Sequence, residues 1–562
     1  MRFRTLKFAV VVAASATAGC TPATDQPNAG IDAPGVAAIE AAATIDAEKL
    51  RETVAVLASD EFEGRGPASS GDIMTQRYLS TALEELGYTP AGVAGSWLQP
   101  FDIVSVTTTT PESWSFTGNG NTLVLRQWDE FIASSGVQEP SAEVRDAEVV
   151  FVGYGLQAPE YDWDDYKGLD VSGKLLLMLN NDPDWDPDLF EGNRRLYYGR
   201  WTYKYEIAAQ LGAAGAIIIH TTPSAGYPFQ VVQTSWSGPQ YALPAQNDPT
   251  TTVQSWITEE AARRLVSFAG LDLAELVESA RSRDFVPVRL GVTTSLSLQN
   301  ELSRVQTANV AGLLEGSDPE LRDEVVVFTA HHDHLGIGEP NAAGDAIYNG
   351  ARDNAVGVAQ VLAVADAFRS LPVRPRRSIL MLFVAAEEQG LLGSAFYAQQ
   401  PTFEPGRIAA NINIDGGNIW GLTRDISFIG FGKSSLDAVV ERIANFQART
   451  VQGDQFPDRG YFYRSDQFNF AKIGVPAVYL GEGTDFIGQP EGWGVEQIDA
   501  WVAVHYHQPS DELEDDWDFS GMIEDAQLAY LIGLQIADAD EMPSWNPGDE
   551  FEAARLESLA DR

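Results

Sequence analysis

The amino-acid sequence predicts an α/β protein in which a mixed, mainly parallel sheet is flanked by helices. Three apolar runs, Val325 to Phe328, Ile379 to Val384 and Asn411 to Ile414, have the composition of buried strands, because a strand covered on both faces needs no polar alternation. From 307 to about 540 such runs alternate with helical patterns, which is typical of parallel sheets. Between about 111 and 287, short β-rich runs with Gly and Pro turns predict a second, inserted region.

Length and charge limit the number of domains and the kinds of binding partner that we expect for this chain. With 562 residues it is longer than one hydrophobic core supports, so we expect at least two domains. The formal net charge of -43 argues against binding nucleic acid or an anionic membrane surface through a basic patch, since both need clustered Lys and Arg. So much acid predicts a solvated surface.

Residues 1–19 have the pattern of an export signal. Basic residues precede a short apolar segment, 8–16, and small residues precede Cys20, the only cysteine. This arrangement resembles the lipobox of bacterial lipoproteins, whose thiol is acylated, although Thr17 stands where the lipobox usually has Leu. Thr21 rather than Asp follows, which by analogy with lipoprotein sorting favours the outer membrane. We expect an exported protein of the periplasm or cell envelope, held at the membrane only by this lipid; the alternative is an ordinary signal peptide with an incidental cysteine.

The segments next to the folded region have distinct compositions. Residues 20–44, rich in Ala, Pro, Gly and Thr, predict a flexible tether. Asp46 is placed to cap a helix, and a second helix is predicted over 72–86. Residues 57–71, between these helices, form a Gly- and Ser-containing loop that we expect to be too polar for the core. The acidic residues 541–562 predict a loosely held tail.

The histidines are clustered. Five of the six fall in two tight groups, His331, His332 and His334, then His505 and His507. Histidines combined with carboxylates suit zinc with an open water position, whereas sites made only of oxygen atoms suit calcium or magnesium. The clusters therefore favour a zinc site.

Residues of the ligand type follow each apolar run. His331, the pair Glu387 and Glu388, and Asp415 stand at the ends of three predicted strands. The carboxyl ends of parallel strands meet at one edge of a sheet, so we expect these side chains to converge. Asp353 begins an apolar, helix-like segment, where a buried carboxylate needs a metal or a positive charge; a helix-capping role is the alternative.

Spacing within the motifs indicates individual roles. Asp333 lies two residues after His331, on the same face of an extended chain, and we expect it to accept a hydrogen bond from that ring; a surface turn is the alternative. Adjacent side chains on an extended chain point apart, so Glu387 and Glu388 have different roles. One can bind metal while the other acts as general base, unless both are solvated acids. His507 comes from a distant loop.

In six ordered motifs the sequence resembles the co-catalytic di-zinc aminopeptidase family that includes aminopeptidase S and glutamate carboxypeptidase. The motifs are TAHHDHLG, NGARDNAVG, FVAAEEQGLLGS, NINID, RSDQFNFAKIGVPAVYLGEG and YHQPSDEL. The resemblance covers about residues 57–513 and implies a zinc-exopeptidase fold with two zinc ions per chain. The implied ligands are His331, Asp353 bridging both ions, Glu388, Asp415 and His507.

The same resemblance implies further roles at the site. Glu387 corresponds to the general base, and Asp333 to the partner of the first histidine ligand. Tyr506 matches a position whose side chain hydrogen-bonds the tetrahedral intermediate. The family also implies a cis peptide bond between Asp353 and Asn354.

The domain boundaries follow from the resemblance. The zinc peptidase domain is expected over 45–110 and 305–540. The insertion, 111–295, resembles a protease-associated domain through FVGYGLQAPEYDWDDYKGLDVSGKLLLMLN. Two positions depart from the family pattern: Arg352 stands where many relatives have Asp or Leu, and Gln467 where some have His. Arg352 is a candidate for holding a substrate carboxylate, although we favour a surface salt bridge.

These implications predict a zinc-dependent exopeptidase, an aminopeptidase that hydrolyses the N-terminal residues of short peptides. A carboxypeptidase is the first alternative and needs a basic cluster at the site, for which Arg352 and Arg464 are the candidates. A glutaminyl cyclase of similar fold uses a single zinc ion, which five ligands disfavour. A receptor-like surface protein of this fold is expected to have lost ligands.

Overall fold

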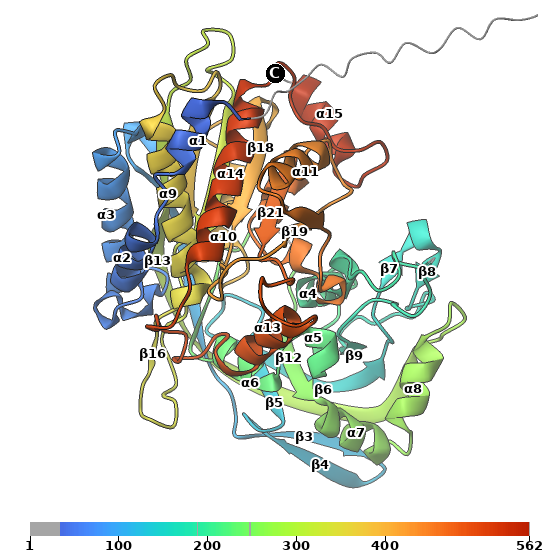
Figure 1. Ribbon diagram of the computed structural model, residues 1–562. Coiled ribbons are helices and arrows are strands. Elements are labelled where there is room, and N and C mark those ends of the chain that lie inside the picture. Colours follow the sequence, from blue (N-terminus) through green and yellow to red (C-terminus); the bar gives the residue numbers. More distant parts are fainter. Residues whose placement is uncertain (1–33, 188, 247–248, 561–562) are drawn as a thin grey trace, which may run out of the picture. The chain divides into compact units, whose positions relative to one another are not determined.

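The computed structural model describes residues 34–187, 189–246 and 249–560, and Pro34–Arg562 form one compact unit (Figure 1). The predicted export signal and Cys20 lie outside the described residues. Within those residues, every helix is too short or too polar to pass through a bilayer.

A mixed sheet that is parallel at its centre carries the fold. Its strands are β1 (Thr89–Pro90), β13 (Val288–Leu314), β14 (Val325–His331), β17 (Ser378–Val384), β18 (Ile408–Ile414), β19 (Asp425–Ile429), β20 (Thr450–Gln452) and β21 (Ala477–Gly481). They lie in the order β1, β13, β17, β14, β18, β21, β19, β20, and the central four, β17, β14, β18 and β21, run parallel. Three of these four are the apolar runs identified in the sequence. The predicted α/β class with a mainly parallel sheet is therefore confirmed.

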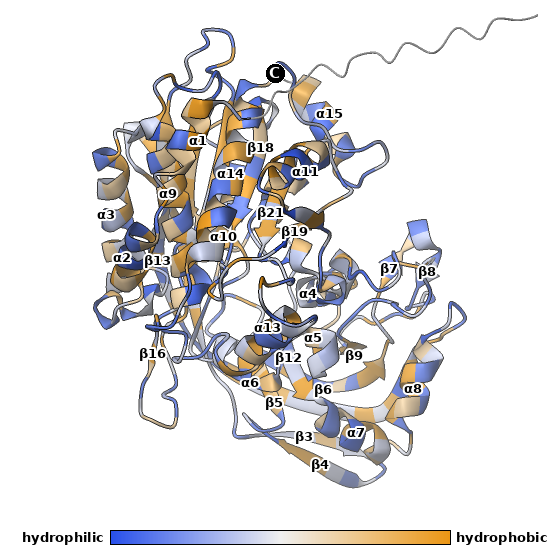
Figure 2. Ribbon diagram, in the orientation of Figure 1, coloured by the Kyte–Doolittle hydropathy of each residue, from blue (hydrophilic) through white to orange (hydrophobic). Residues whose placement is uncertain are grey.

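Both faces of this sheet are covered. Val326 and Phe328 of β14 enter one hydrophobic core, while Val325 and Val327 enter another. Alternate side chains thus meet two apolar layers, which explains why the strand shows no polar alternation. Hydrophobic colours run through the central strands and the helix faces against them, whereas loops are mostly hydrophilic (Figure 2). The helices of this part are α1 (Val36–Ala42), α2 (Ala47–Leu57), α3 (Ser70–Glu85), α9 (Val356–Ser370), α10 (Leu392–Gln399), α11 (Asp437–Phe446), α12 (Gln467–Lys472), α13 (Trp493–Val504), α14 (Ser520–Asp538) and α15 (Glu552–Ala560).

The β-rich region predicted from the composition is also present. Its strands are β2 (Leu98–Thr109), β3 (Ser113–Gly118), β4 (Asn121–Arg126), β5 (Phe131–Ser135), β6 (Ser141–Phe151), β7 (Gln157–Ala158), β8 (Trp163–Asp164), β9 (Leu175–Leu179), β10 (Gly215–His220), β11 (Pro239–Ala242) and β12 (Val253–Thr258). Its helices are α4 (Trp201–Gln210), α5 (Thr222–Ala225), α6 (Phe229–Ser235), α7 (Glu259–Phe268) and α8 (Leu273–Ala280). One apolar core lies within it, and a second continues from it into the peptidase region, where it includes Phe462, Phe468 and Trp545.

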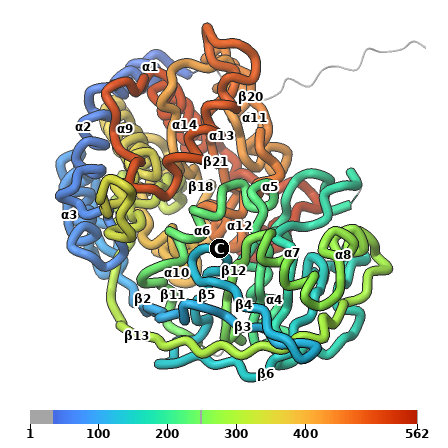
Figure 3. The backbone as a smooth tube through the Cα atoms, turned by 90° about the horizontal axis from the view of Figure 1, so that it is seen from below, coloured from blue at the N-terminus to red at the C-terminus, as the bar shows by residue number. Residues whose placement is uncertain are grey.

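Strand β13 joins the two regions. Its first half pairs with β3 and β6, and its second half pairs with β2 and β17, so hydrogen bonding continues from one region into the other. Figure 3 shows this long segment running from beside α3 to the strands β3 and β6. The strand crosses the boundary expected between 295 and 305. The assignment of the region as a protease-associated domain stays a prediction.

The first predicted helix forms as expected. The Asp46 carboxylate accepts a hydrogen bond from the backbone N–H of Lys49 at 3.0 Å and so caps α2. Leu50, Val54 and Leu57 follow at helical spacing and are fully buried. The second predicted helix is α3, which begins two residues earlier than predicted.

The prediction of a flexible tether over residues 20–44 is wrong for the part that forms a helix. Residues 36–42 form α1, and Ala38, Ala41 and Ala42 are buried in the core that also contains α9 and α14. Alanine has the highest helix propensity, and its small side chain allows close packing on another helix. Composition alone therefore did not separate a flexible segment from a short docked helix.

The prediction of a loosely held C-terminal tail is also wrong. Trp545 and Phe551 are buried, with ring centroids 5.1 Å apart. Arg555 on α15 is 1% exposed and donates a hydrogen bond to the carbonyl of Ile408 at 2.9 Å. Two aromatic residues and one arginine thus fix a segment that is otherwise acidic.

Candidate metal centre

The side chains predicted to bind metal converge at the carboxyl edge of the parallel strands. His331 ends β14, Asp415 follows β18, and Glu388 follows β17. Asp353 comes from the turn before α9, and His507 from the loop after α13. Strand direction therefore brings three of the five to one place, and two loops supply the others.

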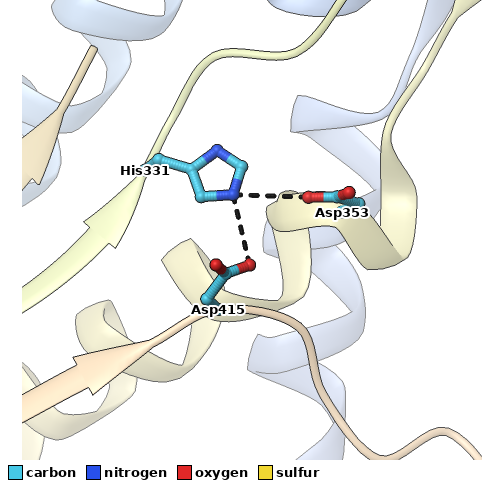
Figure 4. A group of neighbouring side chains, drawn as sticks. All are labelled: His331, Asp353 and Asp415. Carbon is cyan, nitrogen blue, oxygen red and sulfur yellow. Dashed lines mark hydrogen bonds and ion pairs between the residues drawn. The ribbon is translucent and has the colours of Figure 1, made fainter. Parts of the chain in front are cut away.

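Three of these side chains form a first group of donors. Nε2 of His331 lies 3.3 Å from Oδ1 of Asp353 and 3.3 Å from Oδ1 of Asp415 (Figure 4). One nitrogen and two oxygen atoms thus point at a common centre, close enough together to bind one metal ion.

A second group shares Asp353 with the first. Nε2 of His507 lies 3.3 Å from Oδ2 of Asp353 and 3.0 Å from Oε2 of Glu388. One oxygen of Asp353 therefore faces each histidine. The peptide bond between Asp353 and Asn354 is cis, as the family resemblance implied.

The chemistry of these donors fits a pair of metal ions. Nε2 of His507 is buried and makes no hydrogen bond of acceptable geometry, although two carboxylates lie beside it. Burial raises the pKa of the Asp353 carboxyl, but His331 and His507 outweigh burial and hold that pKa well below its usual range. Closely spaced buried carboxylates need positive charge, which two imidazoles and divalent cations supply.

Glu387 and Glu388 both face this cluster. The chain turns after β17, so these residues are not on an extended strand and their side chains do not diverge across a sheet as the sequence suggested. Burial raises the pKa of Glu387 well above its usual range, and Asp415 and Glu388 add to this effect against His331. Burial also raises the pKa of Glu388, but His507 outweighs it and the pKa falls to about 2.

The Asp333 carboxylate does not accept the predicted hydrogen bond from the His331 ring. Its Oδ1 lies 3.8 Å from Nδ1 of His331, which is too far for a hydrogen bond. The ring nitrogen instead lies 3.3 Å from the backbone carbonyl oxygen of Asp333. The carboxylate accepts hydrogen bonds from the backbone N–H groups of Glu387 and Glu388, at 3.0 and 3.4 Å. This happens because Ala386 has a φ of 56°, which turns both amides towards Asp333.

Arg352 was expected to form a surface salt bridge, but the structure buries it. It is 6% exposed, pairs with Glu482, and lies between the rings of Trp420 and Trp501, at 4.6 and 4.3 Å from their centroids. Gln467 is also buried, and its side chain lies within the protein core. Aromatic stacking and a buried acid thus hold Arg352 in the wall of the site.

The sequence reasoning missed two side chains that touch the ligands directly. Nδ1 of His334 lies 2.6 Å from Oε1 of Glu388, and both are buried. Asp511 accepts hydrogen bonds from the backbone N–H groups of Arg352 and Asp353, at 2.9 and 3.0 Å. Both lie within quoted motifs, HHDH and YHQPSDEL, so their position in those motifs was the available signal.

Arg65 is a third missed residue, in the loop predicted to be too polar for the core. It is 1% exposed, and its guanidinium donates hydrogen bonds to four backbone carbonyls. Among them are those of His332 at 2.9 Å, Asn349 at 2.6 Å and Gly350 at 2.8 Å. Arg65 therefore ties together the two segments that carry the first histidine and the shared aspartate.

Two cavities open on the cluster. The smaller, of about 160 Å³, is lined by charged residues of the cluster on one side and by aromatic residues that include Phe456, Tyr479 and Trp501. The larger, of about 710 Å³, is lined by the β-rich region together with Glu387, Glu388 and His507. Tyr506 lines both cavities. Its hydroxyl accepts a hydrogen bond of 3.3 Å from Arg464.

The mixed sheet and the buried histidine and carboxylate cluster at its edge define a metal-dependent hydrolase. Residues 309–531 match the model of Peptidase family M28. The predicted membership in a family of zinc peptidases is therefore confirmed.

Individual relatives and solved structures either match only part of this chain or have low sequence identity to it. A probable zinc metalloprotease of Pyricularia oryzae (strain 70-15) is 33% identical over 187 residues, which cover 32% of this chain and 31% of that protein. The match thus spans about a third of the relative's length. An aminopeptidase from Aneurinibacillus sp. strain AM-1 shares the fold, with a TM-score of 0.53 and 17% identity over 90% of this chain and 97% of its own. A zinc aminopeptidase from Bacillus subtilis gives a TM-score of 0.45 and 16% identity over 87% and 94% of the two chains.

Proposed function

We propose that the chain is a zinc-dependent aminopeptidase that removes N-terminal residues from short peptides. The observation that carries this proposal is the position of Asp353, which presents one oxygen to each of two histidines. Two zinc ions would be held by His331 and Asp415 on one side and by His507 and Glu388 on the other, with Asp353 shared. Paired metal sites of this kind suit the hydrolysis of a peptide bond.

Glu387 would act as the general base. When bound, zinc supplies a Lewis acid and lowers the pKa of a water molecule to about 7. The Glu387 carboxylate would take the proton of the attacking water and pass it to the nitrogen of the leaving amine. Its position beside the metal-binding side chains supports this role, and burial, which raises its pKa, favours a carboxylate that can take up a proton and release it again.

Tyr506 and the smaller cavity would position the substrate. The Tyr506 hydroxyl accepts a hydrogen bond from Arg464, so its own proton is free to be donated to the carbonyl oxygen as negative charge develops there. The walls of the smaller cavity, which include Phe456 and Trp501, suit an apolar side chain on the N-terminal residue. Acidic groups of the cluster would receive the free α-amine.

A carboxypeptidase is the second candidate, and one observation favours it. Arg464 lines both cavities and offers a positive charge beside the cluster. Arg352 does not support that reading, because it is paired with Glu482. A glutaminyl cyclase with one zinc ion and a receptor without ligands are both disfavoured, because donors for two ions are present.

Hydrolysis of aminoacyl nitroanilides by the purified full chain tests the proposal. We expect activity that a chelator removes and added zinc restores, and no cleavage once the α-amine is acetylated. Activity that resists chelation, or purified protein without zinc, would contradict a zinc enzyme. Faster cleavage of N-acylated dipeptides than of free dipeptides would assign the carboxypeptidase instead.

We also propose export and lipid attachment at Cys20, on the basis of the N-terminal pattern. Expression in a bacterium with labelled palmitate should place label on the chain and place the chain in the outer-membrane fraction. Substitution Cys20→Ser should abolish both. Labelling that survives the substitution would contradict the assignment.

A further inference from the structure

The larger cavity contains two arginines to which the proposed aminopeptidase function assigns no contact with the substrate. Arg464 belongs to the peptidase region, and Arg200 immediately precedes α4 of the β-rich region. Both line the cavity that also contains Glu387 and His507. A positive wall and the metal cluster therefore face the same space.

Arg464 is held by aromatic groups. Its guanidinium lies 5.4 Å from the ring centroid of Tyr227 and 5.1 Å from that of Tyr461, and it donates a hydrogen bond to the hydroxyl of Tyr506. In the described part of the chain it forms no ion pair with a carboxylate. The tyrosines orient the guanidinium without neutralising it.

One buried atom of the Arg200 side chain has no hydrogen-bond partner. This atom is Nε, which is shielded from solvent and has no hydrogen-bond acceptor. Burial and the neighbouring charge of Arg464 together lower the pKa of Arg200 to about 10, so the group is protonated at neutral pH. Among the described residues, no carboxylate pairs with this guanidinium either.

Arg200 and Arg464 lie close enough for the charge of one to lower the pKa of the other. A buried charge is costly unless an opposite charge meets it. The helix α4 begins at Trp201, which also lines the cavity, and a helix N-terminus favours an anion. Together, these features indicate a site that can bind a negatively charged ligand.

We propose that Arg200 and Arg464 bind the α-carboxylate of the leaving part of a short peptide, whose N-terminal residue lies at the metal cluster. This inference rests on the proposed function and narrows its substrates to short peptides with a free C-terminus, dipeptides first. Arginine suits the role because its planar fork can donate two parallel hydrogen bonds to a carboxylate. The smaller cavity, with its aromatic lining residues, remains for the N-terminal side chain.

Three dipeptides test the proposal with the zinc-loaded full chain: Phe-Ala, Phe-Ala-amide and Phe-Glu-amide. We expect kcat/KM for Phe-Ala to exceed that for Phe-Ala-amide by about 10- to 100-fold, the usual effect of charge-assisted hydrogen bonds. Equal values would overturn the carboxylate site while leaving the aminopeptidase intact. If Phe-Glu-amide were cleaved faster than Phe-Ala and Phe-Ala-amide, and these two were cleaved equally, the arginines would bind an acidic side chain and not the terminal carboxylate.

The variant Arg200→Gln separates recognition from folding. It should lower kcat/KM for Phe-Ala about 10- to 100-fold and leave Phe-Ala-amide within about twofold, with Arg200→Lys between. Its melting temperature should change little, because no ion pair is lost and the guanidinium lies 5.7 Å from the centroid of the Trp201 ring, a weak contact. A clear fall, together with an equal loss of kcat/KM on both substrates, would indicate a structural role and overturn the proposal. Arg145→Gln, with a side chain 77% exposed in the same region, is the matched control.

A binding measurement keeps the test independent of turnover. In the zinc-loaded Glu387→Gln variant, calorimetry should give a lower Kd for Phe-Ala than for Phe-Ala-amide, and adding Arg200→Gln should remove the difference. If the wild-type protein cleaved neither peptide, the proposed function would fail, and this experiment would still decide whether the arginines bind a carboxylate. Equal Kd values would decide against them.

Discussion

The Oγ atom of Ser235 lies 2.7 Å from Nδ1 of His507, which is 272 positions further along the chain. Ser235 is the last residue of α6, so the β-rich region touches a proposed zinc ligand directly. A histidine whose Nδ1 is engaged presents Nε2, and in His507 Nε2 is the atom that faces Asp353 and Glu388. The region thus contributes to the metal site and does not merely cover it.

Removing this contact should weaken metal binding. In Ser235→Ala we expect the affinity of one of two zinc ions to fall about 10- to 100-fold, as is usual when a partner of a ligating histidine is lost. Competition with a chromophoric chelator measures it. Ser237→Ala is the control, because Ser237 donates only to the carbonyl of Thr234. Unchanged affinity in Ser235→Ala would show that the hydroxyl does not orient the ring.

Replacing the proposed base should affect turnover and not metal content. We expect Glu387→Gln to lower kcat about 10²- to 10⁴-fold, because the carboxylate that moves the proton is lost while the amide occupies the same volume. Steady-state kinetics and elemental analysis on the same preparation check this. Glu441→Gln, at an exposed position on α11, is the control. A variant that lost zinc would place Glu387 among the ligands instead.

Metal removal should destabilise the fold. Without metal ions, the half-buried carboxylates of Asp353, Glu387, Glu388 and Asp415 lie close together and repel one another. A ligand present at about 1,000 times its Kd stabilises the folded state by about 4 kcal/mol. Thermal unfolding should therefore occur at lower temperature after dialysis against a chelator and recover when zinc is added. A melting temperature that does not respond to zinc would argue against a tightly bound metal.

The metal-binding side chains at the strand ends could be predicted from the sequence, but the side chains of other regions that position them could not. His331 ends one predicted strand and Asp415 follows another, so their position at one edge of the sheet could be inferred from strand direction. Ser235 and Arg65 stand in short polar segments with no periodicity, and only the tertiary fold shows what they touch. The burial of Trp545 was missed because the prediction for its segment rested on the acidic composition and not on its single aromatic residues.

Arg65 offers the sharpest test of how the site is held together. Its guanidinium serves four backbone carbonyls, two of which belong to Asn349 and Gly350, just before the shared Asp353. Burial lowers the pKa of Arg65 to about 10, so it still carries its charge at neutral pH. In Arg65→Met the carbonyls lose their donors, and we expect the free energy of unfolding to fall by about 3 to 5 kcal/mol.

Denaturant unfolding of Arg65→Met, Arg65→Lys and the control Arg77→Ala separates the possible causes. Lysine keeps the charge but cannot match the fork of a guanidinium, so it should recover only part of the stability. Arg77 is exposed on α3, and its loss should change stability by less than about 0.5 kcal/mol. If Arg65→Met were as stable as the wild type, the segments carrying His331 and Asp353 would have to be held by the strands and by Asp511 alone. In that case zinc affinity would also be unchanged, whereas a loss of both together would show that one guanidinium positions the two halves of the metal site.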